Sequence, residues 1–152
     1  MARATARVAA MQMIFERFAG GQGGEDTLRM VYEELREDKA RPVAEEDPGL
    51  ADRAWIERIL QGVRTSQPEL DRRISAASRN WSIDRMARVD LTILRLAVWE
   101  ILNEEDVPGS VVINEAVEMA NCYSGENSGR FINGILGTIL RQEQAAKESK
   151  EP

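Results

Sequence analysis

The stretch "DLTILRLAVWEIL", residues 90–102, decides the fold of this 152-residue chain. Its apolar residues fall on nearly every side of a helix, so that helix needs neighbours all round it and belongs at the centre of a bundle. No stretch of the chain shows the sustained alternation of apolar and polar residues that is typical of β-strands, and aromatic residues make up only 5 %. The sequence therefore predicts an all-α protein.

Helical periodicity continues on both sides of this central stretch. We expect about seven helices in two small packed bundles that form a single domain over residues 1–152. The N-terminal subdomain covers about residues 1–80, the C-terminal subdomain covers about 81–145, and a polar, frayed tail follows at 146–152. The predicted helix starts are Thr5, Asp26, about Ala51, Ser66 (a capping box with Pro68 in the first turn), about Asp90, Ser110 and Ser128, the last helix ending near Gln142.

Composition argues against an enzyme. The chain has no histidine, which removes the commonest general base and metal ligand, and its only cysteine is Cys122. We therefore expect no catalytic residues, no metal site and no cofactor. No signal peptide or stretch of roughly 20 apolar residues is present, which predicts a cytoplasmic protein without a membrane segment.

Charge is unevenly distributed along the chain. The net charge is −6, yet residues 58–100 carry eight arginines against five acids, a local balance of 8 − 5 = +3. A basic region can bind a polyanion even when the whole protein is acidic. Net charge alone therefore does not exclude nucleic acid as a partner.

A polar cluster interrupts the apolar spacing in "INEAVEMANCYSGENSGRFINGILG", residues 113–137. Buried polar groups must be paired, so we expect Asn114, Glu115 and Asn133 to tie the two C-terminal helices together. Phe131 has two interpretations. It continues a row with Ile135 and Ile139, which favours the core, and it follows Arg130, which favours a stacking surface next to a charge.

Three segments of the chain resemble the family of the bacterial transcription antitermination factor NusB. The most specific runs from Asp106 to Leu136 and contains "DVP", "INEAVE" and "RFINGIL" in order. The pattern "AR..A.Q..F" from Ala6 to Phe15 resembles the family's first helix, and "VD..ILRLA.WE" from Val89 to Glu100 resembles its central helix. The resemblance covers essentially the whole chain, with a weak match over residues 20–50, and implies the same two-bundle fold.

The resemblance also implies a function. Members of the family bind boxA, a short single-stranded RNA, together with the small-subunit ribosomal protein NusE, and help RNA polymerase read through terminators in rRNA operons. Such a site needs cations for the phosphates and a planar side chain for a base. The RNA-binding candidates are Arg3, Arg7, Gln12, Phe15, Arg130 and Phe131. The alternatives are a solvated charge for Arg7 and a hydrogen bond between helices for Gln12.

The resemblance places the protein partner at the start of the central helix. Asp90 stands where the family has an acid that faces NusE, and Arg85 and Arg88 lie nearby in the sequence. The alternative for Asp90 is the N-cap of the central helix. A homodimer that hides the RNA surface is also left open by the resemblance.

The chain departs from the family pattern at several cationic positions. Ala4 and Thr5 interrupt an N-terminal arginine run, and Leu91 and Asn121 stand where basic residues are common. Fewer cations release fewer counterions, so we expect modest affinity for RNA alone and dependence on the partner. The alternative function is a protein-binding helical adaptor that keeps the fold with RNA binding weakened or lost.

Overall fold

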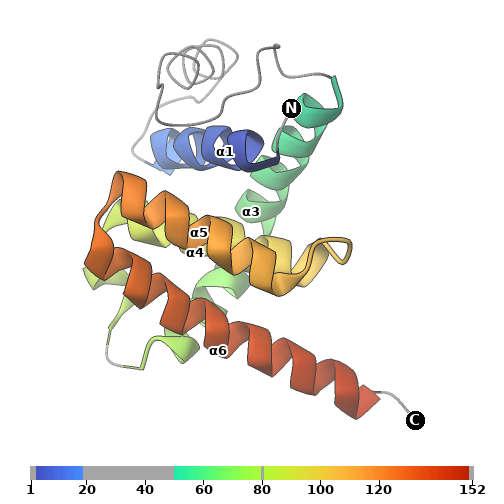
Figure 1. The fold of residues 1–152 in the computed structure, drawn as a ribbon, viewed down its shortest axis with the longest axis vertical. Coiled ribbons are helices and arrows are strands. Elements are labelled where there is room, and N and C mark those ends of the chain that lie inside the picture. The colour runs from blue at the N-terminus through green and yellow to red at the C-terminus, as the bar shows by residue number, and fades with distance from the viewer. Residues whose placement is uncertain (1–2, 19–49, 80, 151–152) are drawn as a thin grey trace. The chain divides into compact units, whose positions relative to one another are not determined.

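The computed structural model describes the backbone of residues 3–18, 50–79 and 81–150 (Figure 1). These residues form five α-helices and one 3-10 helix, with no β-strand, and the prediction of an all-α chain is confirmed. The helix expected from Asp26 lies outside the described residues. The elements are α1 (Arg3–Phe18), α3 (Leu50–Ala77), η1 (Ile83–Arg85), α4 (Arg88–Asn103), α5 (Gly109–Tyr123) and α6 (Glu126–Lys150).

The chain divides into two compact units, Met1–Arg64 and Thr65–Pro152, and the division falls inside α3. In the first unit, α1 begins at Arg3, so the predicted start at Thr5 is two residues late. This helix is buried on more than one side: Val8 and Met11 are buried, and so are the small residues Ala6, Ala9 and Ala10.

One continuous helix replaces the two that the sequence predicts between residues 51 and 77. Pro68 lies inside α3, where its missing N–H leaves one backbone carbonyl without the usual helical partner. The apolar spacing nevertheless runs on without a break, and Val63, Leu70 and Ile74 are all buried. Burial of this continuous face outweighs the single lost hydrogen bond, so the capping-box pattern at Ser66 does not start a new helix.

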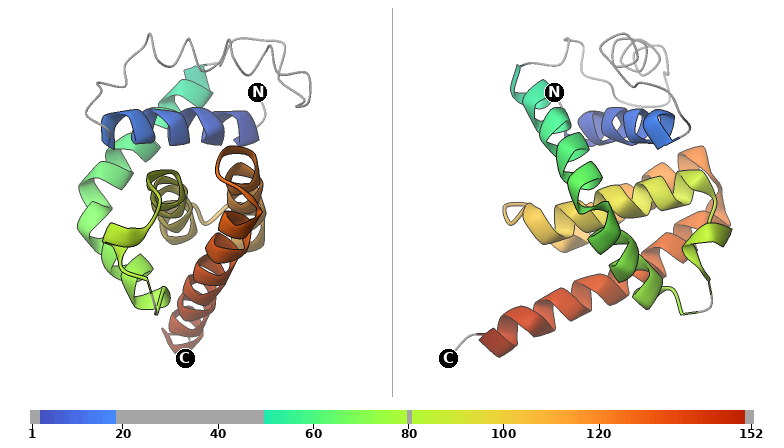
Figure 2. Two further views of the ribbon diagram at one scale, coloured as in Figure 1. Left: turned by 90° about the vertical axis from the view of Figure 1, so that its left-hand side faces the viewer. Right: turned by 180° about the vertical axis from the view of Figure 1, so that it is seen from behind.

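Helix α4 is the centre of the second unit, as predicted. Every residue from Asp90 to Glu100 is buried, and the helix packs against both α5 and α6. Figure 1 shows α5 and α6 as an antiparallel pair joined by a short turn, and Figure 2 shows α6 diverging from α5 toward its C-terminal end. Helix α6 continues to Lys150, well past the expected end at Gln142, because residues such as Ala145, Ala146 and Lys147 favour a helix.

The turn between α5 and α6 depends on Gly125. Its φ of 153° lies in a region that residues with a side chain rarely adopt. In this conformation its N–H donates to the carbonyl of Ala120 at 2.8 Å and closes α5. Its own carbonyl accepts from the amides of Ser128 and Gly129 at 3.1 and 3.2 Å and opens α6. One residue thus ends one helix and begins the next.

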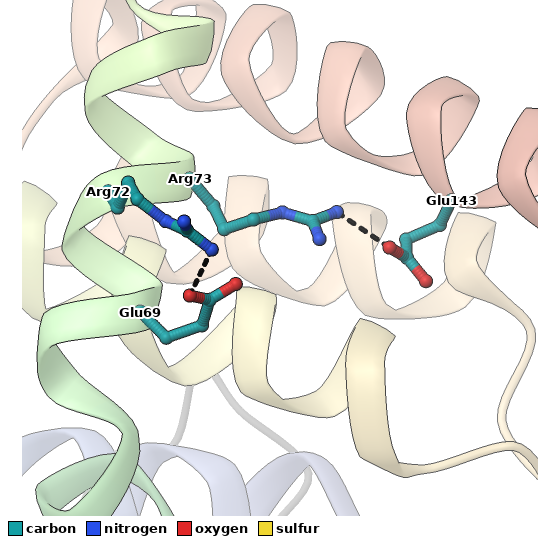
Figure 3. A network of polar contacts seen from close by, with 4 residues as sticks. All are labelled: Glu69, Arg72, Arg73 and Glu143. Carbon is teal, nitrogen blue, oxygen red and sulfur yellow. Dashed lines mark hydrogen bonds and ion pairs between the residues drawn. The ribbon is translucent and has the colours of Figure 1, made fainter.

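Ion pairs connect three helices of the second unit. Arg95 of α4 is almost fully buried and donates twice to Asp71 of α3, at 2.7 Å from Nε and 2.9 Å from a terminal nitrogen. Arg73 of α3 reaches Glu143 of α6 at 2.7 Å, whereas Arg72 pairs with Glu69 on the surface of α3 itself (Figure 3). Across the described residues, no helix has the length and hydropathy that crossing a bilayer requires.

Gly125→Ala is expected to lower the free energy of unfolding by about 1–3 kcal/mol, because alanine is strained at a positive φ. Urea titration followed by circular dichroism measures this. Gly134→Ala is the matched control: Gly134 lies within α6 with open space where a Cβ would stand, so alanine there should raise the free energy of unfolding by up to about 1 kcal/mol. Equal effects of the two substitutions would contradict the role given to Gly125.

Asp71→Ala is expected to cost about 3 kcal/mol or more of unfolding free energy, because it leaves the buried Arg95 guanidinium without its carboxylate. The exposed pair supplies the control. Glu69→Ala should change the free energy of unfolding by less than about 1 kcal/mol, since Glu69 and its partner Arg72 both face solvent. A small loss for Asp71→Ala would show that Arg95 finds another acceptor.

Candidate functional site

The second unit contains a pocket with a volume of about 250 Å³. Three segments line it: the connection between α3 and α4, the first turn of α4, and the first two turns of α6. Most of the lining is apolar, but charged and amide side chains also contribute. The lining residues that matter for its chemistry are Trp81, Arg85, Asp90, Asn127, Ser128 and Phe131.

Two aromatic rings form one corner of this pocket. Trp81 and Phe131 meet edge to face, with ring centroids 6.2 Å apart and an angle of 71° between the ring planes. Phe131 is half-buried and Trp81 is 53 % exposed, the largest exposed fraction of any large apolar side chain among the described residues. Phe131 is thus neither fully in the core nor fully exposed, and it lines the pocket; its role as a stacking surface stays a prediction.

Two serine hydroxyls, linked by hydrogen bonds, position Asp90 in the pocket. Ser128 of α6 donates to Asp90 Oδ2 at 3.0 Å, and the Ser124 and Ser128 hydroxyls lie 2.8 Å apart. Since the single Ser128 hydrogen goes to Asp90, Ser124 donates to Ser128. The other carboxylate oxygen, Oδ1, is buried without a hydrogen-bond partner in the described part of the chain. A buried acceptor left unpaired costs stability.

The N-cap interpretation of Asp90 is wrong. Helix α4 begins at Arg88 with Ala87 as its N-cap, so Asp90 lies inside the first turn. An acid in that position still interacts favourably with the positive end of the helix. The side chain is nevertheless directed to Ser128 and not to a backbone amide of α4, and it joins α4 to α6.

The predicted cations of this region lie on the surface. Arg85 lines the pocket and is exposed, and Arg88 and Arg130 are exposed as well. The sequence predicts an RNA role for Arg130 and Phe131 and a partner role for Arg85 and Asp90. The structure brings Phe131, Arg85 and Asp90 into the same pocket, so the two predicted surfaces meet there.

The remaining predicted RNA residues lie on α1, in the first unit. Arg7 is only 3 % exposed, and its guanidinium lies over the Trp55 ring, 5.9 Å from the ring centroid. Gln12 and Phe15 are half-buried, and the Arg3 side chain lies outside the described residues. Arg7 is thus part of the packing of its unit and not the solvated charge that was the alternative, and its RNA contact stays a prediction.

Asn114 and Asn133 do not tie the C-terminal helices together. Both side chains are exposed, so that prediction is wrong, and the link between the helices is made by Ser124 and Ser128 with Asp90. An asparagine near an apolar stripe in the sequence need only turn slightly round the helix to reach water. Leu91, a departure from the family pattern, is buried and serves the core of α4.

Sequence reasoning did not assign Trp81 or Ser128 to the site. The available signal for Trp81 was a tryptophan between polar residues in "RNWSID", where no helical stripe would bury it. Ser128 had no such signal, because its role depends on Asp90, which lies 38 residues earlier in the chain.

In the described residues no group of histidine, cysteine and carboxylate side chains is placed to hold a metal ion. The pocket is suited to binding a flat group that stacks at its aromatic corner.

Comparison with known proteins identifies related chains over almost the whole length. The model of the NusB family matches residues 4–141. A transcription antitermination protein NusB from Clostridium botulinum (strain Loch Maree / Type A3) is 38 % identical over 141 residues, which cover 92 % of this chain and 100 % of the relative. The corresponding protein of Sorangium cellulosum is 41 % identical over 138 residues, 91 % of each chain.

Solved structures agree with the fold. NusB from T. maritima superimposes with a TM-score of 0.74 at 31 % identity, covering 93 % of this chain and 92 % of that one. A structure of the antitermination factors NusB and NusE in complex with double-stranded RNA gives a TM-score of 0.71 at 23 % identity, covering 92 % of this chain and 96 % of that one. At that identity the second match shows a shared fold.

Ser128→Ala is expected to lower the free energy of unfolding by about 1–3 kcal/mol, because it removes the hydroxyl that donates to Oδ2 of Asp90, whose Oδ1 is already unpaired. Chemical denaturation measures the change. Ser149→Ala is the control, since that hydroxyl is exposed and bonds only to the carbonyl of Ala146 within its own helix. If the two variants were equally stable, the link between Ser128 and Asp90 would contribute nothing.

Proposed function

The chain belongs to the NusB family, and from this premise we propose that it is a transcription antitermination factor that binds RNA together with a NusE-type protein. It is not an enzyme, since NusB proteins are non-enzymatic factors. The relatives that support this proposal carry the name transcription antitermination protein and are covered over 91–100 % of their length. The proposal therefore concerns the whole activity of the family and not one module of it.

The observation that carries RNA binding is the aromatic corner beside exposed arginines. A single-stranded RNA presents unstacked bases and a phosphate track, and it is bound by rings that stack on bases and cations that follow the phosphates. Phe131 and Trp81 provide the rings, and Arg130 and Arg85 provide exposed charge on the same segments. We assign Arg130 and Phe131 to RNA on this basis.

The finer part of the proposal concerns the RNA and the partner. We expect a boxA-type single-stranded RNA in nascent rRNA-operon transcripts, with NusE as co-binder and RNA polymerase engaged indirectly in the cytoplasm. A solved complex of this fold contains NusE and RNA, which supports the pairing of the two ligands. Arg88 and the pocket residues Arg85 and Asp90 are assigned to NusE, because the resemblance places the protein partner at the start of α4.

The contribution of α1 is a separate part of the proposal. Arg3, Gln12 and Phe15 keep their predicted RNA roles, while Arg7 is nearly buried beside Trp55. With the Arg7 charge taken up in packing, fewer cations remain for phosphates. This favours modest affinity for RNA alone and a large gain when NusE is bound.

A protein-binding adaptor of the same fold is the second candidate function. It is favoured by one observation, that the chain has a net charge of −6. One binding experiment distinguishes the two candidate functions. A factor binds boxA-type RNA when NusE is present, whereas an adaptor binds NusE without any gain in RNA affinity.

Phe131→Leu is expected to weaken RNA binding in the presence of NusE by about 5- to 150-fold, because it keeps apolar bulk but removes the stacking ring. Arg130→Ala should weaken binding and reduce the slope of log affinity against log salt by about 0.7, the effect of one phosphate contact on a single strand. Fluorescence anisotropy of a labelled boxA-type RNA at several salt concentrations measures both effects.

Arg141→Ala serves as the control for these variants. Arg141 is also an exposed arginine of α6, but its partner Thr138 lies in its own helix, outside the pocket lining. Its removal should leave the salt slope unchanged. If Arg130→Ala and Arg141→Ala behaved alike, general attraction to a polyanion would explain the binding and the assigned site would be wrong.

A further inference from the structure

We propose that Trp81 is an RNA-binding residue, whose indole and the Phe131 ring together hold one unstacked base of single-stranded RNA. The inference rests on the proposed function and deepens it, since it names the side chain that completes the base site. Neither the sequence prediction nor the family resemblance assigns a role to Trp81.

The first observation is the cost of exposing this residue. Trp81 is 53 % exposed, whereas the other two tryptophans, Trp55 and Trp99, are 5 % and 6 % exposed. The exposed part of a large ring adds little to stability, and tryptophan is enriched among the residues that anchor binding sites. The exposed ring also faces a pocket and does not project from an otherwise flat surface.

The second observation is that the Trp81 backbone is held in place. Its N–H donates to the carbonyl of Ser78 at 2.7 Å, and the Ser78 hydroxyl donates back to the carbonyl of Trp81 at 2.9 Å. Ser78 itself is buried at the end of α3. A ring on a backbone fixed in this way loses little conformational entropy when a ligand stacks on it.

The third observation is the chemistry around the ring. The edge-to-face contact with Phe131 makes a corner, so a flat ligand can stack on one ring while its edge meets the other. The pocket accordingly offers a stacking face at the corner between the two rings.

Charge selects RNA over a protein segment as the occupant. Arg79, close to Trp81 in the chain, and Arg130, beside Phe131, are both exposed, and neither is assigned to NusE. Exposed cations next to a stacking corner fit a phosphate chain with bases attached. A peptide from a protein partner is the competing occupant, and the experiment includes it as an outcome.

The first test uses the intrinsic fluorescence of the wild-type protein. Because Trp55 and Trp99 are buried, iodide or acrylamide should quench mainly Trp81. Adding a boxA-type single-stranded RNA with NusE should protect this emission from the quencher. In Trp81→Phe the two buried tryptophans remain as an internal control. Adding RNA and NusE to this variant should not change how strongly its emission is quenched.

The second test measures affinity. Trp81→Ala should weaken RNA binding by about 5- to 150-fold, the range expected for one lost stack, while Trp81→Phe retains part of it. Val111→Ala is the matched control, since Val111 is also an exposed apolar side chain (41 %) but lies on α5, outside the pocket lining. Unchanged circular dichroism and urea midpoints would show that the variants fold.

An abasic scan locates the base. A set of RNAs is used, each of which lacks one base. For one of these RNAs Trp81→Ala should cause no further loss of affinity, because the base that stacks on Trp81 is already missing from it. Unchanged RNA affinity of Trp81→Ala would overturn the inference and leave the proposed function standing. Protection of Trp81 by NusE alone would assign the pocket to the protein partner and overturn it as well. Absence of RNA binding by the wild-type protein with NusE would overturn both.

Discussion

Burial of α4 from Asp90 to Glu100 is the constraint on which the second unit depends. A helix buried on all sides needs a partner for each polar group that it carries inward. Arg95 obtains its partner from Asp71 of α3, and Asp90 obtains one from Ser128 of α6. These two links set where α3 and the start of α6 lie against α4. Because Ser128 and Phe131 share the first turns of α6, the second link also brings Phe131 to the pocket.

The pocket is a consequence of how this core ends. At the start of α4 the buried residues give way to a connection that carries Trp81, Arg85 and Met86, and of these only Met86 is buried. The core therefore stops at Met86, and the rings of Trp81 and Phe131 are left at its edge. A chain without histidine can still have a function there, because binding RNA needs stacking surfaces and charge and no bond need be made or broken.

The helices were predictable where the signal was local, and less so where several local signals competed. Periodicity identified the central helix and the α5–α6 pair, since burial of one face repeats every three or four residues. The capping-box pattern at Ser66 predicted a helix start that the continuous apolar face of α3 overrides. The N-cap alternative for Asp90 fails because helix starts are uncertain by a few residues: the observed N-cap, Ala87, lies three residues earlier, and Asp90 pairs with Ser128 on another helix.

The sequence by itself determined the fold class, the central position of α4 and the family, because these depend on composition, periodicity and motif order along the chain. It also identified Phe131, Arg130 and Asp90 as residues of interest. Only the tertiary structure showed that Phe131 and Asp90 share a pocket with Trp81, that Ser128 holds Asp90, and that Arg7 is packed over Trp55. The physical reason is distance in sequence: Asp90 and Ser128 lie 38 residues apart, and no local pattern records which helices meet.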